Sequence, residues 1–193
     1  MPLPPLLLGL TLLLACSVVA AVTLGPSSLA AGEALRLLWA GLSGGTIAAD
    51  EVSSYTIVWE IRFPRAVLAV VVGAGLAAVG AAVQAMVRNA LADPFVLGIS
   101  SGAAVGANAV LLFGAFAALG VWALSGAAFV SALLAMVLVY AAARSPQGLV
   151  PLRLVLTGTA MAYGFSAITT LMVFRAERGE AARSAMMWLL GSL

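Results

Sequence analysis

The run from Gly98 to Gly102 (GISSG) matches G-x-S-x-G, the pattern that exposes a nucleophilic serine in one large class of hydrolases. A serine hydroxyl is a weak nucleophile unless a neighbouring base takes its proton. The chain has no histidine and no lysine, and Asp93 is the only acid near the middle of the sequence. The run therefore favours close helix packing by small residues over an intramembrane hydrolase built on Ser100.

Other kinds of catalytic and metal site also lack the side chains that they need. Cys16 is the only cysteine, which excludes an internal disulfide and a cysteine cluster for a metal. A Walker A loop requires lysine, so any ATP-driven work needs a partner that supplies the ATPase site. A formal net charge of +2 does not suggest nucleic acid as a partner. We expect no cofactor, no metal site and no enzymatic activity in the chain itself.

A stripe of hydroxyl groups runs along the last long apolar stretch. Thr159, Tyr163, Ser166 and Thr170 follow one another at steps of four, three and four residues, which places them on one face of a helix. Polar groups inside a membrane usually face the helix bundle or an aqueous cavity. Two interpretations stay open: the wall of a pathway for a polar solute, or hydroxyls that bond across a helix interface for about 0.6–2 kcal/mol each.

Small and turn-forming residues indicate where helices pack and where the chain reverses. Gly102 and Gly106 form G-x-x-x-G, the spacing that lets two helix backbones approach closely. Gly73 begins a similar row of small residues at every fourth position, and Asn108 is interpreted as a packing residue. The positions assigned to packing or to a cytoplasmic turn are Gly73, Gln84, Asn89, Asp93, Pro94, Gly98, Ser101, Gly102 and Gly106.

Two arginines flank a proline where a polar segment meets an apolar one, in the run Arg62-Phe63-Pro64-Arg65. Proline suits the first turn of a helix, and the residue before it prefers an extended backbone. The run therefore predicts a stiff entry turn that presents two guanidinium groups at the membrane surface. These groups could dock an acidic protein surface through carboxylates or anchor lipid phosphates.

The composition places these residues in a membrane. Hydrophobic residues make up 64% of the 193 positions and charged residues 8%, against about 45–50% and 25% in soluble domains. We expect one transmembrane domain over residues 1–193, with an all-α, polytopic bundle of about five complete helices and the start of a sixth. The five apolar stretches run over Leu6–Leu24, Ala66–Val87, Phe95–Phe116, Val121–Ala143 and Leu152–Phe174, and the sixth begins at Ala185.

The segments between and beyond these stretches carry further expectations. Residues 25–65 form one long polar connection, within which Ala30–Ala40 predicts a short amphipathic helix at the membrane interface. No basic residue precedes the first stretch, which favours a retained helix over a cleaved signal peptide. Because the run from Met186 to Leu193 ends inside an apolar segment, we expect a fragment or a truncated product.

Several motifs together resemble the FecCD-type permeases, which are ABC importers for iron-siderophores, haem and cobalamin. The central motifs are VWEIRFPR ending at Arg65, a Gly/Ala-rich helix that ends just after Gln84, RNALADP ending at Pro94 and LGISSGA ending at Ala103. Two later motifs are LTG at 156–158 and MWLLGS at 187–192. One departure is Ala90, where the family usually has proline.

The resemblance implies a multi-pass permease subunit of the cytoplasmic (inner) membrane, surrounded by lipid. A second permease subunit, two ATPase subunits and an extracytoplasmic binding protein would be its partners. The family's outer arginines, which contact acids on the binding protein, map onto Arg62 and Arg65. The family's fifth helix lines the pathway, which would assign that role to the hydroxyl stripe. Family members have about ten helices, so the chain resembles the first half of one.

The cargo and the orientation stay open on the sequence. Ferric siderophore is the commonest cargo of the family, haem and cobalamin are the alternatives, and a non-transporting membrane assembly subunit is a further one. The resemblance implies a cytoplasmic start, which would place the 25–65 segment on the extracytoplasmic side and leave six arginines outside and three inside. The positive-inside rule prefers the reverse distribution.

Overall fold

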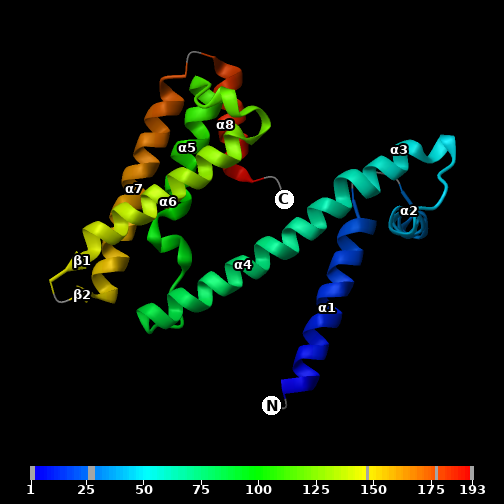
Figure 1. Cartoon of the computed structure of the whole chain (residues 1–193), viewed down its shortest axis with the longest axis horizontal. Helices are drawn as coiled ribbons and strands as arrows, with labels where there is room; N and C mark the ends of the chain where they lie inside the picture. Colours follow the sequence, from blue (N-terminus) through cyan, green and yellow to red (C-terminus); the bar gives the residue numbers. More distant parts are fainter. Residues whose placement is uncertain (1–2, 26–28, 147, 177, 192–193) are drawn as a thin grey trace. The chain divides into compact units, whose positions relative to one another are not determined.

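The computed structural model describes residues 3–25, 29–146, 148–176 and 178–191. The chain forms two compact units, Met1–Gly75 and Leu76–Ser192, and helices dominate both (Figure 1). The elements, in chain order, are α1 (Leu3–Thr23), α2 (Ala31–Ser43), η1 (Ala49–Glu51), α3 (Val52–Tyr55), η2 (Thr56–Arg62), α4 (Phe63–Val87), η3 (Pro94–Leu97), α5 (Ile99–Phe113), η4 (Ala117–Trp122), α6 (Ala123–Ala143), β1 (Arg144–Ser145), β2 (Gly148–Leu149), α7 (Pro151–Phe174) and α8 (Gly179–Leu190).

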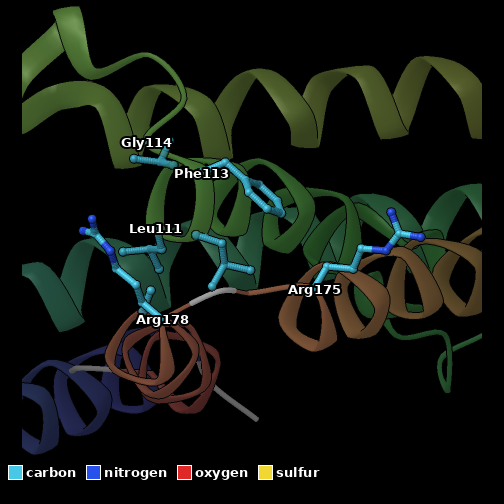
Figure 2. Close-up of a pocket in the computed structure, with 8 residues that line it drawn as sticks. Leu111, Phe113, Gly114, Arg175 and Arg178 are labelled. Carbon is cyan, nitrogen blue, oxygen red and sulfur yellow. The ribbon is translucent and has the colours of Figure 1, made fainter.

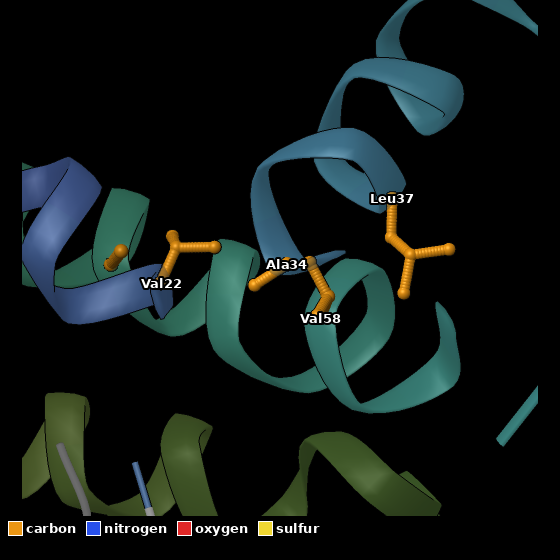
Figure 3. Close-up of a cluster of buried hydrophobic side chains, with 5 residues drawn as sticks. Val22, Ala34, Leu37 and Val58 are labelled. Atoms are coloured by element: carbon orange, nitrogen blue, oxygen red, sulfur yellow. The ribbon is translucent and has the colours of Figure 1, made fainter. Parts of the chain in front are cut away.

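The first unit is built where α1, α2 and the helical run before α4 meet. Figure 3 shows Val22, Ala34, Leu37 and Val58, which are fully buried and come from these three elements. Helix α2 confirms the amphipathic helix predicted over Ala30–Ala40 and ends at Gly44, whose φ of 70° suits glycine at a helix C-cap. This cluster attaches α2 to the end of α1.

The entry to α4 differs from the extended turn predicted before Pro64. Phe63 is helical, with φ −62° and ψ −49°, and its N–H donates to the carbonyl of Val58, five residues earlier. The whole segment Thr56–Arg62 is a π-helix. Proline in an α-helix clashes with the carbonyl four residues earlier, and the wider π turn gives that carbonyl room. The helix therefore continues through Pro64 without a break.

The second unit packs α5 and α7 together with α6. Val139, Ala143 and Leu154 form its buried cluster, with Leu97 and Met161 packed against them. The two-residue strands β1 and β2 pair antiparallel and connect α6 to α7. Short connections of this kind favour antiparallel neighbours.

The helix lengths confirm an all-α, polytopic membrane bundle. Within the described residues, helical segments long and apolar enough to cross a bilayer run over Leu3–Thr23, Ala49–Val87, Ala117–Ala143 and Pro151–Phe174. The expected third stretch, Phe95–Phe116, divides into η3 and the shorter α5 because Gly98 adopts φ +71° between them. The expected sixth helix begins at Gly179 rather than Ala185, and α8 ends at Leu190.

Candidate functional site

A cavity of about 610 Å³ lies among α5, α7 and α8 in the second unit. Its wall contains hydroxyl side chains, alanines and the C-terminal end of α8, and none of these lining residues is charged. The lining residues are Ser100, Ser101, Ala103, Ala104, Ser166, Thr169, Thr170, Trp188, Leu189, Leu190 and Gly191. An uncharged wall of hydroxyls can exchange hydrogen bonds with a passing polar solute without holding an ion.

Two of the four residues in the hydroxyl stripe of α7 line this cavity. Ser166 and Thr170 line it, whereas Thr159 and Tyr163 are not among its lining residues. Tyr163 is 75% exposed, so its ring faces away from the helices of this unit. The Ser166 hydroxyl lies 3.4 Å from the Ser101 hydroxyl and donates to it, which joins the stripe to α5.

The threonines of the stripe present acceptors to their surroundings. The hydroxyls of Thr159 and Thr170 each donate to the carbonyl four residues earlier, at 2.9 Å. Because each hydroxyl proton is used in this hydrogen bond, only the oxygen lone pairs can accept a hydrogen bond from another molecule. A solute at Thr170 would therefore be recognised through its own N–H or O–H groups.

Thr169 is not one of the four stripe residues, yet it lines the cavity and is buried. Its Oγ1 has no hydrogen-bond partner among the described residues. Ser100 also lines the cavity, and the GISSG run was the signal that could have assigned both of its serines to this wall. For Thr169 the spacing carried no such signal, because only contact with the neighbouring helices distinguishes it from a lipid-facing hydroxyl.

Gly98 brings the start of α5 against α7. A Cβ added at Gly98 would lie 3.0 Å from the carbonyl oxygen of Gly158 and 3.2 Å from the backbone nitrogen of Ala162. Just before it, Asp93 caps η3 by accepting from the Phe95 N–H at 2.8 Å, with Pro94 at the first helical position. This turn positions Ser100 and Ser101 in the wall of the cavity.

Gly102 and Gly106 hold α5 against α6. A Cβ at Gly102 would overlap the Cβ of Ala135, and one at Gly106 would overlap the carbonyl oxygen of Ala127 and the Ser131 hydroxyl. The G-x-x-x-G pair thus lies on a close backbone contact of the kind that its spacing predicts.

The other predicted packing and turn positions have fewer partners. Asn89 forms a local turn, in which its Oδ1 accepts from the Leu91 N–H at 2.9 Å. Gln84 is exposed, and its backbone carbonyl accepts from the Asn89 N–H. An added Cβ at Gly73 would meet no described atom within 4 Å, so its packing role stays a prediction. Asn108 is fully buried and donates to the Ala104 carbonyl.

The paired arginines of the first unit have different environments. Arg62 is half-buried and its Nη1 donates to the carbonyls of Val22 at 3.0 Å and Thr23 at 3.2 Å, at the end of α1. Those carbonyls lack partners within the helix and carry its negative dipole end, which a guanidinium satisfies. Arg65 is exposed, and no hydrogen bond or ion pair involves its side chain among the described residues.

A second cavity, of about 560 Å³, lies beside the end of α5. Figure 2 shows Leu111, Phe113, Gly114, Arg175 and Arg178 around it, with the two guanidinium groups pointing away from each other. The positive charges of Arg175 and Arg178 therefore do not converge on a common site in this cavity.

Comparison with known proteins assigns the chain to a family. The model of the FecCD transport family matches residues 10–193. The chain belongs to this family. The FecCD match includes all three helices around the hydroxyl-lined cavity.

The curated relatives that the chain matches are named for different cargoes. The chain is 33% identical over 189 residues to the molybdate import system permease protein MolB of Haemophilus influenzae, covering 98% of the chain and 54% of MolB. It is 41% identical over 141 residues to the cobalamin import system permease protein BtuC of Halobacterium salinarum, covering 73% and 37%. It is 40% identical over 186 residues to the achromobactin transport system permease protein CbrC of Dickeya dadantii, covering 96% and 50%.

A solved structure supports the same assignment. It is described as a metal-chelate type ABC transporter in an inward-facing conformation, and it matches with a TM-score of 0.72 at 28% identity. The match covers 98% of this FecCD chain and 52% of the solved one. The chain thus spans about half the length of the relatives that it matches.

Proposed function

We propose that the chain is part of the permease of a binding-protein-dependent ABC importer in the cytoplasmic membrane, and that ferric siderophore is its cargo. The FecCD match over residues 10–193 carries this proposal. A second permease subunit, separate ATPase subunits and an extracytoplasmic binding protein complete the importer. The chain supplies part of the pathway and the ATPases supply the energy.

The hydroxyl-lined cavity supports a pathway role for α7. Ser166 and Thr170 of the predicted stripe line it together with Ser101 of α5. No lining residue is charged, so a chelate could pass without being trapped by an opposite charge. Thr159 and Tyr163 extend the same helix face beyond the cavity, and the exposed ring of Tyr163 is available to a second subunit or to the solute.

The choice of siderophore rests on the family's commonest cargo and on the likeness to CbrC, an achromobactin permease. Cobalamin is the main alternative, because BtuC proteins are among the relatives. Haem, molybdate and a membrane assembly role without transport are further alternatives that the same experiment separates.

The test is uptake by the assembled importer in proteoliposomes, with labelled ferric siderophore, cobalamin, haem and molybdate compared in parallel. We expect ATP-dependent uptake of the siderophore. Accumulation of another cargo alone would overturn the choice of cargo, and uptake of none by a complex with active ATPase would favour the assembly role.

A matched pair of threonine variants tests the pathway wall in the same assay. Thr170→Val should change the uptake rate by about two- to tenfold, which corresponds to one hydrogen bond. Thr11→Val is the control, because Thr11 also donates to the carbonyl four residues earlier but lies exposed on α1. Equal rates for the two variants would remove Thr170 from the pathway.

A further inference from the structure

Helix α2 carries an apolar stripe that its own unit does not cover. Leu35, Trp39 and Leu42 are 43%, 71% and 58% exposed, and steps of four and three residues place them on one face. A different face of α2, with Ala34 and Leu37, is fully buried in the cluster of Figure 3. The exposed stripe is therefore additional to the surface that holds the helix in the fold.

The contacts of the buried face set the height of α2 relative to the membrane. Its neighbour Val22 lies in the last turn of α1, a span of 21 residues and thus about 30 Å, which equals the hydrocarbon thickness. Arg62 bonds to the carbonyls at that same end of α1. Val58, the other neighbour, lies one turn before Arg62. Helix α2 thus lies where both spans leave the hydrocarbon.

A third face of α2 is polar. Arg36 is exposed and forms an ion pair with Glu51 of η1. Ser43 and Gly32 extend this face, and both are exposed. Around its circumference, α2 therefore meets protein on one side, presents leucine and tryptophan on the second, and presents paired charges on the third.

We propose that α2 lies in the lipid headgroup layer, with Leu35, Trp39 and Leu42 inserted at the boundary with the acyl chains. Tryptophan prefers this boundary, and leucines on an interfacial helix bury their side chains among the upper acyl carbons. The ion pair between Arg36 and Glu51 faces water. Because Arg36 already has an acidic partner, the insertion depends on apolar contact and not on anionic lipid. The inference rests on the membrane spans and is independent of the cargo.

The experiment leaves Trp39 as the single tryptophan of the assembled complex in nanodiscs, with Trp59, Trp122 and Trp188 and every tryptophan of the partner subunits replaced by phenylalanine. We expect Trp39 fluorescence to be quenched by lipids brominated near the ester groups, and less by lipids brominated near the chain ends. Aqueous iodide should quench it weakly, and exchange of neutral for anionic lipid should leave the profile unchanged. A protein that retains only Trp59 is the control. Its ring packs against Gly41 of α2 and not against lipid, so the brominated lipids should quench it less than Trp39.

Two other outcomes would overturn the proposal. Strong iodide quenching without lipid quenching would place Trp39 in water, and protection from both quenchers would show that protein covers the stripe.

A spin label at Trp39→Cys in a Cys16→Ser background gives a second measurement that keeps the other tryptophans. Greater accessibility to oxygen than to a water-soluble nickel complex supports insertion, and the reverse order refutes it.

Discussion

The contact between α5 and α6 at Gly102 allows a quantitative prediction about packing. An alanine at 102 would add a Cβ that overlaps the Cβ of Ala135, and the Ser131 carbonyl oxygen would lie 3.3 Å away. Carbon atoms pack at about 3.5–4.0 Å, so the two helices must separate or shift. Gly102→Ala should therefore destabilise the bundle although alanine is the better helix former.

The size of the effect follows from two opposing contributions. Overpacking a close contact costs about 1–3 kcal/mol, and replacing glycine by alanine in a helix gains up to about 1 kcal/mol. Gly126→Ala isolates the second contribution, because Gly126 is also the fourth residue of its helix and an added Cβ there meets no described atom within 4 Å. The difference in unfolding free energy between the two variants should be about 1–3 kcal/mol.

The assay is unfolding in mixed micelles titrated with sodium dodecyl sulfate and followed by fluorescence. Ala135→Gly removes the methyl group that an alanine at 102 would strike, so it should restore part of the loss in the double variant. If Gly102→Ala is as stable as Gly126→Ala, or if Ala135→Gly gives no rescue, the close contact does not exist and the reasoning fails.

The remaining predictions concern the arginines and a buried hydroxyl. Arg62→Gln should lower the melting temperature, because two carbonyls at the end of α1 lose a charged donor worth about 1.5–3 kcal/mol. Arg65→Glu should leave the melting temperature unchanged and weaken docking of the binding protein; equal affinity in a pull-down would contradict a docking role. Thr169→Val should be neutral or stabilising by thermal denaturation, because its Oγ1 has no partner to lose among the described residues. A loss above about 1 kcal/mol would show that this hydroxyl is bonded.

Much of the fold could be predicted because hydrophobic length and glycine spacing act locally. The apolar stretch ending at Phe174 predicted α7 to within one residue at its start, since Pro151 is favoured in a first turn. The polar segment predicted α2, and the G-x-x-x-G spacing predicted a close backbone contact on α5. In each case the signal lies within a few turns of one helix.

The features that could not be predicted depend on several segments at once. Pro64 lies inside a continuous helix because the preceding turns widen, and no local rule indicates that widening. The hydrogen bonds of Arg62 to α1 join residues 40 and 39 positions apart. Thr169 enters the cavity wall through its neighbours on α5 and α8. Spacing along one helix contains none of this information.

The π-helix before α4 makes chain length in that segment more important than side-chain identity. A π turn holds one more residue than an α turn, so loss of one residue between Thr56 and Arg62 would tighten the segment into ordinary helix. Pro64 would then follow ordinary α-helix, where its ring clashes with the carbonyl four residues earlier. Point substitutions in the segment leave the number of residues, and therefore the wider turn, unchanged. Among homologous chains, insertions and deletions should therefore be rarer here than amino-acid replacements.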